Sequence, residues 1–134
     1  MRFFFYGTLL DAEVRRMVLA EEVLTEPAVL DGYRRVVVAG RNYPVLIPDP
    51  SGRVDGLLSG ALGSSARSRL VAYEGPEYRV ADLAVGTGDG HSISASVFLQ
   101  VLGLSWLDQA WCLDDWQRRH KRRFLRQFSG RMIS

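Results

Sequence analysis

Cysteine is almost absent from this chain, which has a single thiol, Cys112, among its 134 residues. One cysteine cannot form an internal disulfide, and this suits a reducing compartment such as the cytoplasm. Because Cys112 lies in an aromatic stretch, we expect it to be a buried small hydrophobe rather than a redox or nucleophilic group. A disulfide-stabilised framework is therefore excluded.

Long apolar runs are also missing. No stretch approaches the ~20 apolar residues that a membrane span requires. The aromatic start at Phe3–Phe5 stops at Gly7, and no small-residue cleavage site follows a proper apolar region, so we expect no signal peptide. These absences predict an unprocessed, soluble, cytoplasmic protein without a membrane partner.

The residues that usually hold metals and cofactors are sparse. The two histidines, His91 and His120, lie far apart and have no Cys or His neighbour at metal-ligand spacing, so no metal site is expected. The glycine-rich segment 86–90 precedes a strand instead of opening a helix, which favours a hairpin loop over a nucleotide loop. No serine lies in a nucleophile-elbow pattern. No metal or nucleotide site is therefore readable from these residues.

What is present suits one globular domain over residues 1–134, because 47% of the residues are hydrophobic and the length allows a buried core. The patterns predict an α+β fold with too many short strands for a simple open parallel sheet. The predicted elements are a strand at 2–6, a helix at 11–20, strands at 28–30 and 33–39 joined by an Asp31-Gly32 turn, a turn at 48–52, a strand at 54–62, a short helix ending at Glu74-Gly75-Pro76, a hairpin of 78–85 with 92–99, and helix from Trp106 onward.

The first candidate site is the segment Tyr6, Gly7, Thr8 and Leu9, between the first strand and the first helix. Backbone N–H groups at a helix start lack partners within the helix and lie at its positive end. A glycine there lets a carboxylate or a polarised carbonyl approach the backbone. Taken alone, the pattern equally fits a tight strand-to-helix turn with nothing bound.

The second candidate is Glu74, at the predicted end of the short helix. The negative end of that helix, together with partial burial, would raise the pKa of the carboxyl toward neutrality, which suits a general base. Tyr73 and Tyr78 flank it and could donate hydroxyl groups. The alternative is an exposed glutamate in a turn, and we expect this of the nearby Glu77, which follows Pro76.

The third candidate is the basic run 118–123, continued by Arg126. On one helix these residues would form a basic face opposite Trp116, Phe124 and Phe128, able to contact RNA or another anionic surface. A solvated face whose arginine stems cover apolar surface is the favoured interpretation. Nothing else in the chain is typical of a nucleic-acid-binding module, so nucleic acid is the less favoured partner.

Four ordered segments together resemble the gamma-glutamylcyclotransferase-like family, which includes gamma-glutamylamine cyclotransferases and plant avirulence-induced proteins. The segments are Phe5–Leu10, Tyr43-Pro44 with Pro48-Asp49, Gly52–Gly56, and Leu70–Gly75 before Tyr78-Arg79. The resemblance runs from about residue 2 to about residue 99. It implies a small mixed β-barrel with flanking helices, with the barrel at about 1–100 and a helical segment at about 105–130.

The same resemblance implies a cofactor-independent cyclotransferase that converts a gamma-glutamyl amine or amino acid into 5-oxoproline and a free amine. Glu74 would accept the proton, Gly7, Thr8 and Leu9 would bind the glutamyl group with Tyr6 beside them, and Tyr43 and Tyr78 would line the pocket. A relative that binds a glutamyl metabolite without turning it over is the main alternative. The leaving amine, and the choice between a monomer and a homodimer, stay open.

Overall fold

The computed structural model describes the backbone of residues 2–100 and 103–133, and the side chains of these residues up to 128. This part of the chain forms six strands, four α-helices and one 3-10 helix. Their order is β1 (Phe4–Phe5), η1 (Thr8–Leu10), α1 (Ala12–Leu19), β2 (Thr25–Val38), β3 (Pro44–Ser59), α2 (Ser64–Glu74), β4 (Tyr78–Thr87), β5 (Ser92–Gln100), β6 (Trp106–Ala110), α3 (Leu113–Arg119) and α4 (Lys121–Ile133).

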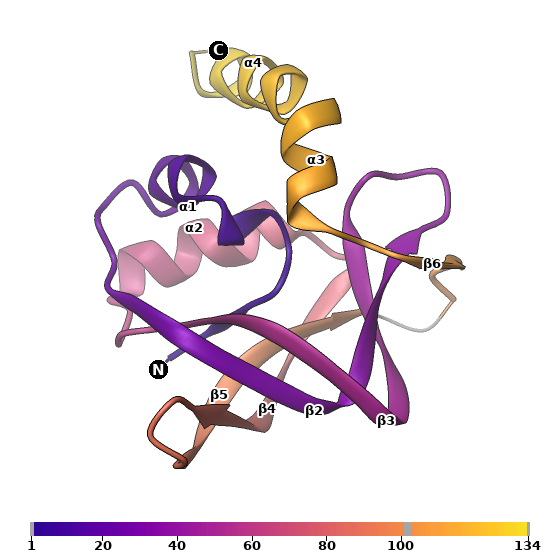
Figure 1. Cartoon of the computed structure of the whole chain (residues 1–134). Coiled ribbons are helices and arrows are strands. Elements are labelled where there is room, and N and C mark those ends of the chain that lie inside the picture. Colours follow the sequence, from indigo (N-terminus) through magenta and orange to yellow (C-terminus); the bar gives the residue numbers. More distant parts are fainter. Residues whose placement is uncertain (1, 101–102, 134) are drawn as a thin grey trace.

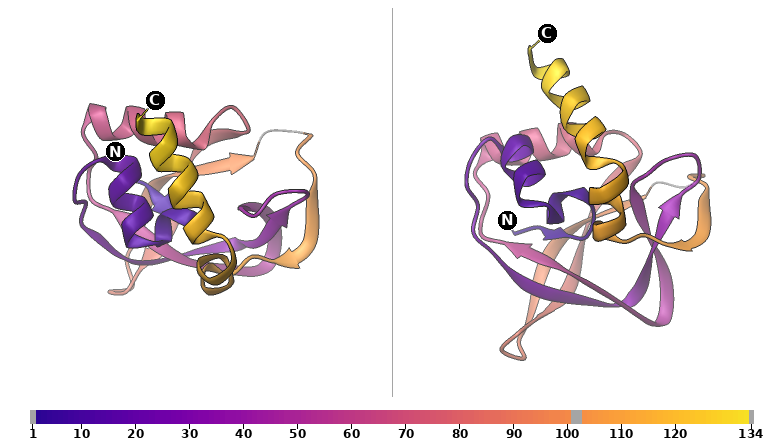
Figure 2. Two further views of the ribbon diagram at one scale, coloured as in Figure 1. Left: turned by 90° about the horizontal axis from the view of Figure 1, so that it is seen from above. Right: turned by 45° about the horizontal axis from the view of Figure 1, so that its top comes forward.

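The strands form one sheet in the order β1-β3-β2-β4-β5, and β6 pairs with β2. All ladders between named strands are antiparallel. An isolated parallel bridge between Phe3 and Ser96 joins the two outer strands. One bridge does not make a continuous ladder, so the α+β class is confirmed but the expected closed barrel is wrong. The helices gather on one side of the sheet (Figures 1 and 2). In the described residues, no helix is long and apolar enough to cross a membrane.

The hairpin of β2 and β3 differs from the prediction. Asp31-Gly32 is not a turn, because β2 continues through it and pairs with β3 on both sides. The register jumps there, with Asp31 opposite Arg53 and Tyr33 opposite Pro48. Gly32 has a φ of +87°, a conformation that serves a bulge as well as a tight turn. The predicted turn at 48–52 therefore lies within β3, where the strand carries the extra residues of this bulge.

The C-terminal part also differs from the prediction. Residues 106–110 are not helical but form β6, which pairs with β2 through Ala110 and Val36. The helical region that follows is divided at His120, whose φ of −126° and ψ of −21° leave helical geometry. The basic run therefore spans two helices and not one continuous face.

Other predicted elements are confirmed. Asp11 caps α1 by accepting a hydrogen bond from the Val14 N–H at 3.0 Å. The β4–β5 hairpin pairs in continuous register from Tyr78 to Gly86. α2 ends at Glu74, and Gly75 has a φ of +77°, as a glycine stop requires.

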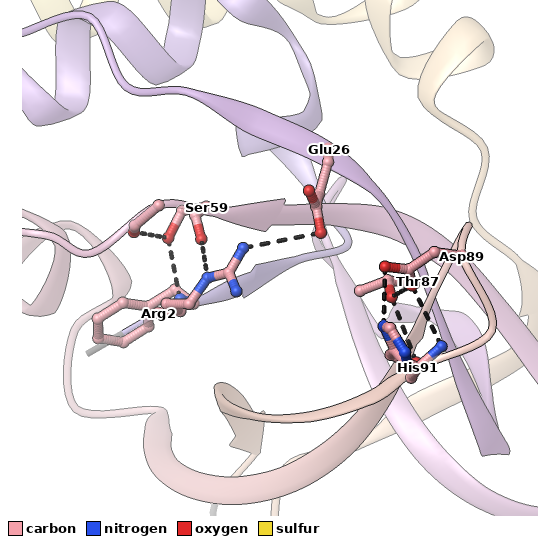
Figure 3. A network of polar contacts seen from close by, with 8 residues as sticks. Arg2, Glu26, Ser59, Thr87, Asp89 and His91 are labelled. Atoms are coloured by element: carbon pink, nitrogen blue, oxygen red, sulfur yellow. Dashed lines mark hydrogen bonds and ion pairs between the residues drawn. The ribbon is translucent and has the colours of Figure 1, made fainter.

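Two polar networks secure strand ends (Figure 3). Ser59 accepts from the Phe3 N–H at 2.9 Å and from the Arg2 Nε at 3.0 Å, which ties the first residues to the end of β3. Thr87, Asp89 and His91 close the turn between β4 and β5. Neither network includes a residue that lines the cavity described next.

Candidate active site

A cavity of about 990 Å³ lies where the first strand-to-helix bend, the end of α2 and the C-terminal helices meet. Both candidate motifs line it. So do the loop before β3, which carries Tyr43, and part of α4, which the sequence did not connect with the site. The lining comprises residues 4–9, 41–44 and 72–78, with Met17, Val18, Arg69, Phe98, Trp116, Phe124, Gln127 and Phe128.

All four residues of the Tyr6–Leu9 segment line this cavity. The N–H groups of Leu10 and Asp11 donate to the carbonyls of Gly7 and Thr8, at 2.9 and 3.1 Å, and so close the 3-10 turn. Within the described part of the chain, the N–H groups of Gly7, Thr8 and Leu9 donate to no protein acceptor. These are the first amides of the turn, which lack intrahelical partners. The segment can therefore offer donors to a bound anion or carbonyl.

Space around position 7 favours glycine. A Cβ on Gly7 would lie 3.1 Å from Pro44 Cγ and 3.3 Å from Pro44 Cδ. Such contacts are tighter than ordinary packing. Absence of a side chain thus lets the loop before β3 close onto this bend.

Glu74 is the last residue of α2 and is half-buried. Among the described residues its carboxyl accepts no hydrogen bond and pairs with no cation. Burial raises its pKa from 4.5 to about 7, because a poorly solvated site disfavours the charged form. Burial is thus the cause, where the sequence suggested the end of the helix as well. A carboxyl with such a pKa can both take and return a proton near neutral pH.

Tyr6 and Tyr78 lie close enough to Glu74 for its charge to affect their hydroxyls. The pKa of each is raised above 10, first by burial and also by the negative charge of Glu74. The Tyr6 hydroxyl donates to the Phe98 carbonyl at 2.5 Å, and the Tyr78 hydroxyl donates to the Pro44 carbonyl at 2.8 Å. Both residues line the cavity, and these two bonds already engage their hydroxyl protons.

Tyr43 lines the cavity and contacts Glu77, a partner that the sequence did not predict. Its hydroxyl lies 3.2 Å from each carboxylate oxygen of Glu77 and 3.2 Å from the Arg41 Nε. The expectation that Glu77 faces water is therefore wrong, since the side chain is half-buried and lines the cavity. Its orientation depends on the loop before β3, which a local pattern around Pro76 could not indicate.

Thr8 and Tyr73 join the bend to the helices. Their hydroxyl oxygens are 2.6 Å apart. The Tyr73 ring packs edge-on against Phe124 and Phe128, each with a centroid separation of 6.1 Å. Trp116 packs against Phe124 at 5.5 Å. These four rings, which we call the aromatic wall, bound the part of the cavity nearest α4.

Asp11 holds the C-terminal helices against α1. Its buried carboxylate accepts from Gln117 of α3 at 2.8 Å and lies 2.8 Å from the Lys121 Nζ of α4. Burial alone would raise the pKa of Asp11, but hydrogen bonds from Lys121, Gln117 and Val14 outweigh it and hold the pKa below the usual value. Figure 2 shows α3 and α4 beside α1 on the helical side of the sheet. This contact is a reason why the aromatic wall stands over the cavity.

Several cations of the basic run are occupied in ion pairs. Arg118 lies 3.5 Å from Asp114, and Arg119 lies 3.1 Å from Asp115. Lys121 is held by Asp11. Cys112, just before α3, is exposed, so its expected burial is wrong. Among the described residues, no group of three or more His, Cys, Asp or Glu side chains could hold a metal ion.

Comparison with known proteins gives consistent results. The model of the family "Gamma-glutamyl cyclotransferase, AIG2-like" matches residues 3–118. AIG2-like protein A of Arabidopsis thaliana is 28% identical over 132 residues, covering 93% of this chain and 77% of its own. Protein AIG2 C of the same plant is 25% identical and covers the same shares.

Solved structures share the fold. An Arabidopsis thaliana protein solved in solution superimposes with a TM-score of 0.72 at 25% identity, covering 98% of this chain and 90% of its own. A structure described as gamma-glutamyl cyclotransferase superimposes with a TM-score of 0.66 at 18% identity, covering 79% and 68%. At that identity the likeness concerns the fold alone. Because the family match extends over most of its length, the chain belongs to the gamma-glutamyl cyclotransferase, AIG2-like family.

Proposed function

We propose that this protein is a cyclotransferase that converts a gamma-glutamyl amine or amino acid into 5-oxoproline and a free amine, with Glu74 as the general base. Family membership supports a cyclotransferase at the level of the family. The observation that carries the finer assignment is that Glu74 lines the same cavity as Gly7–Leu9, whose amides have no acceptor among the residues that the structure describes.

The proposed reaction is intramolecular. The α-amino nitrogen of the glutamyl group attacks its own γ-carbonyl carbon, forming the ring C–N bond while Glu74 takes the amine proton. Collapse of the tetrahedral intermediate breaks the bond to the leaving nitrogen, which receives a proton from the Glu74 carboxyl. Glu74 is thus regenerated as a carboxylate, and no oxidant, reductant or cofactor enters the balance.

The site would contribute in two ways. Holding both reacting groups in a cyclising conformer exploits an orientation advantage that can reach ~7–11 kcal/mol in well-aligned intramolecular reactions, although much of it belongs to the substrate. A positioned base adds about 10²–10⁴-fold. The pKa of about 7 suits this task, because a substantial share of Glu74 is ionised at neutral pH.

The amides of the Tyr6–Leu9 segment would bind the substrate's negative oxygens. They can clamp the α-carboxylate or stabilise the charge that develops on the γ-carbonyl oxygen. A donor aimed at developing charge in a poorly solvated site is worth more than the same donor in water. Tyr43 and Tyr78 would form the wall around the glutamyl group.

The direct test is 5-oxoproline release from a panel of gamma-glutamyl amines and amino acids. Glu74→Gln should keep the fold and lower kcat by about 10²–10⁴-fold. Glu26→Gln is the matched control, because Glu26 pairs with Arg2 outside the cavity. Full turnover in Glu74→Gln would refute the assigned base, and loss in Glu77→Gln alone would transfer the role to Glu77. Binding of 5-oxoproline without turnover of any substrate would favour the non-catalytic alternative.

A further inference from the structure

Arg35 is a half-buried cation on β2 that stands behind the first strand-to-helix bend. Its Nη1 donates to the Tyr6 carbonyl at 2.7 Å and reaches the Asp55 carbonyl at 3.4 Å. Its guanidinium lies over the Trp111 ring, 5.3 Å from the centroid, which fixes its plane. The mechanism proposed above gives Arg35 no role.

The burial of Arg35 is energetically unfavourable. Among the described residues it forms no ion pair with a carboxylate, and its buried Nε has no hydrogen-bond partner. Burial lowers the pKa of Arg35 and outweighs the charge of Asp55, which favours the ionised guanidinium from a distance. Burying a donor without an acceptor is also unfavourable. Arg34, the preceding residue, instead pairs with Asp108 at 2.6 Å near the surface. The contrast directs attention to the one short contact that Arg35 does make, at the Tyr6 carbonyl.

That contact acts on Gly7 through the peptide plane. The Tyr6–Gly7 peptide is trans, since the described chain has no cis bond, and the C=O and N–H of a trans peptide point in opposite directions. A cation that fixes the Tyr6 carbonyl from one side therefore directs the Gly7 N–H to the other. Gly7 lines the cavity, and its N–H has no protein acceptor in the described residues.

We propose that Arg35 is a positioning residue, which orients the Gly7 N–H toward the cavity and, through the Tyr6 carbonyl, polarises it as a donor to a negative oxygen of the gamma-glutamyl substrate. This inference rests on the proposed function for its substrate. The guanidinium does not touch substrate; it acts through one peptide group. A cationic donor whose plane is held by the Trp111 ring suits that task better than a neutral donor.

The test compares three variants by 5-oxoproline release. Arg35→Met keeps the apolar stem and removes the charge, and should lower kcat/KM by about 10- to 100-fold, since a directly lost oxyanion donor costs about 10²–10³-fold. Arg35→Lys retains a cationic donor and should recover at least part of this loss. Arg34→Met, the matched control, should behave as wild type. The pH dependence attributed to Glu74 should not move in any of them.

An NMR readout tests the same inference without turnover. In ¹⁵N-labelled protein the Gly7 amide resonance should shift strongly in Arg35→Met, partly return in Arg35→Lys, and stay in place in Arg34→Met. An unmoved Gly7 resonance, or wild-type kcat/KM in Arg35→Met, would overturn the proposal. If Arg35→Met fails to fold, Arg35→Gln replaces it under the same criteria. If the wild-type protein releases no 5-oxoproline, the proposed function fails separately, while the Gly7 resonance still decides the role of Arg35.

Discussion

The two ends of the cavity are built on opposite principles. The polar end is formed by the Tyr6–Leu9 segment and Glu74, and within the described residues its amides have no protein acceptor and its carboxyl has no hydrogen-bond or ion-pair partner. The four rings of the aromatic wall pack against one another in edge-on and stacked pairs. Each such pair stabilises a fold by about 0.5–1.5 kcal/mol beyond the contribution of buried area. The polar end thus leaves hydrogen-bonding groups for a ligand, whereas the ring contacts of the aromatic wall stabilise the fold.

The two ends also differ in their relation to the family. The polar end lies within residues 3–118, which the family model matches, and so do Tyr73 and Trp116 of the aromatic wall. Phe124 and Phe128 stand on α4 beyond that match. The hydroxyls of Thr8 and Tyr73 join the two ends at 2.6 Å. Under the proposed function, the polar end would carry the reaction and the aromatic wall would contact the leaving amine.

The largest expected effect concerns stability at the polar end. The pKa of Glu74 is raised from 4.5 to about 7 in the folded protein, so the folded state binds a proton more tightly than the unfolded state between these values. The free energy of unfolding should therefore fall as pH rises through this window, by up to about 3 kcal/mol. Glu74→Gln cannot ionise and should escape the loss. Urea denaturation at pH 4.5, 6 and 8 measures the difference.

The expected pattern is specific in sign. The stability gain of Glu74→Gln over wild type should be small near pH 4.5 and grow until about pH 8, while its activity is lost. Glu26→Gln, in an exposed ion pair, should show no such trend, since pairs of this kind contribute little. A gain in Glu74→Gln that did not change with pH would mean that the carboxyl is well solvated, and would weaken its role as a base.

A smaller effect is expected from Gly7→Ala. The added Cβ would meet Pro44 at 3.1 Å, so the bend or the loop must move by a few tenths of an ångström. Displacement of positioned donors by up to an ångström can cost about 10²-fold, so we expect kcat/KM to fall by about tenfold. Gly63→Ala is the control, because a Cβ there meets nothing within 4 Å. Equal activity of the two variants would show that the bend does not position substrate.

Local signals predicted the backbone elements of the polar end. The strand–glycine–helix order located the bend, and the Gly-Pro stop located Glu74, because each signal is complete within a few residues. The Asp31-Gly32 turn failed for a physical reason: positive φ serves a bulge and a hairpin equally, and only the pairing of a long β3 decides between them.

The aromatic wall, Arg35 and Glu77 could not be placed in the same way. Their positions depend on contacts between distant segments: Asp11 with α3 and α4, Trp111 with Arg35, and Tyr43 with Glu77. Residues 106–110 are all exposed, so no alternation of apolar residues marked them as a strand. In β6, pairing with β2 determines the strand, and the local sequence pattern does not.

The smallest expected effect, at the aromatic wall, tests whether α4 contacts the leaving group. If the glutamyl group occupies the polar end, the amine points toward Phe128, whose loss removes apolar contact area. Phe128→Ala should raise KM about three- to tenfold for a gamma-glutamyl benzylamide and leave a gamma-glutamyl methylamide unchanged, because only the larger amine reaches the wall. Arg122→Ala, which changes an exposed side chain of the same helix, is the control. Equal changes for both substrates would mean that the wall only stabilises the fold, and the division of the cavity into a reacting end and a selecting end would then be abandoned.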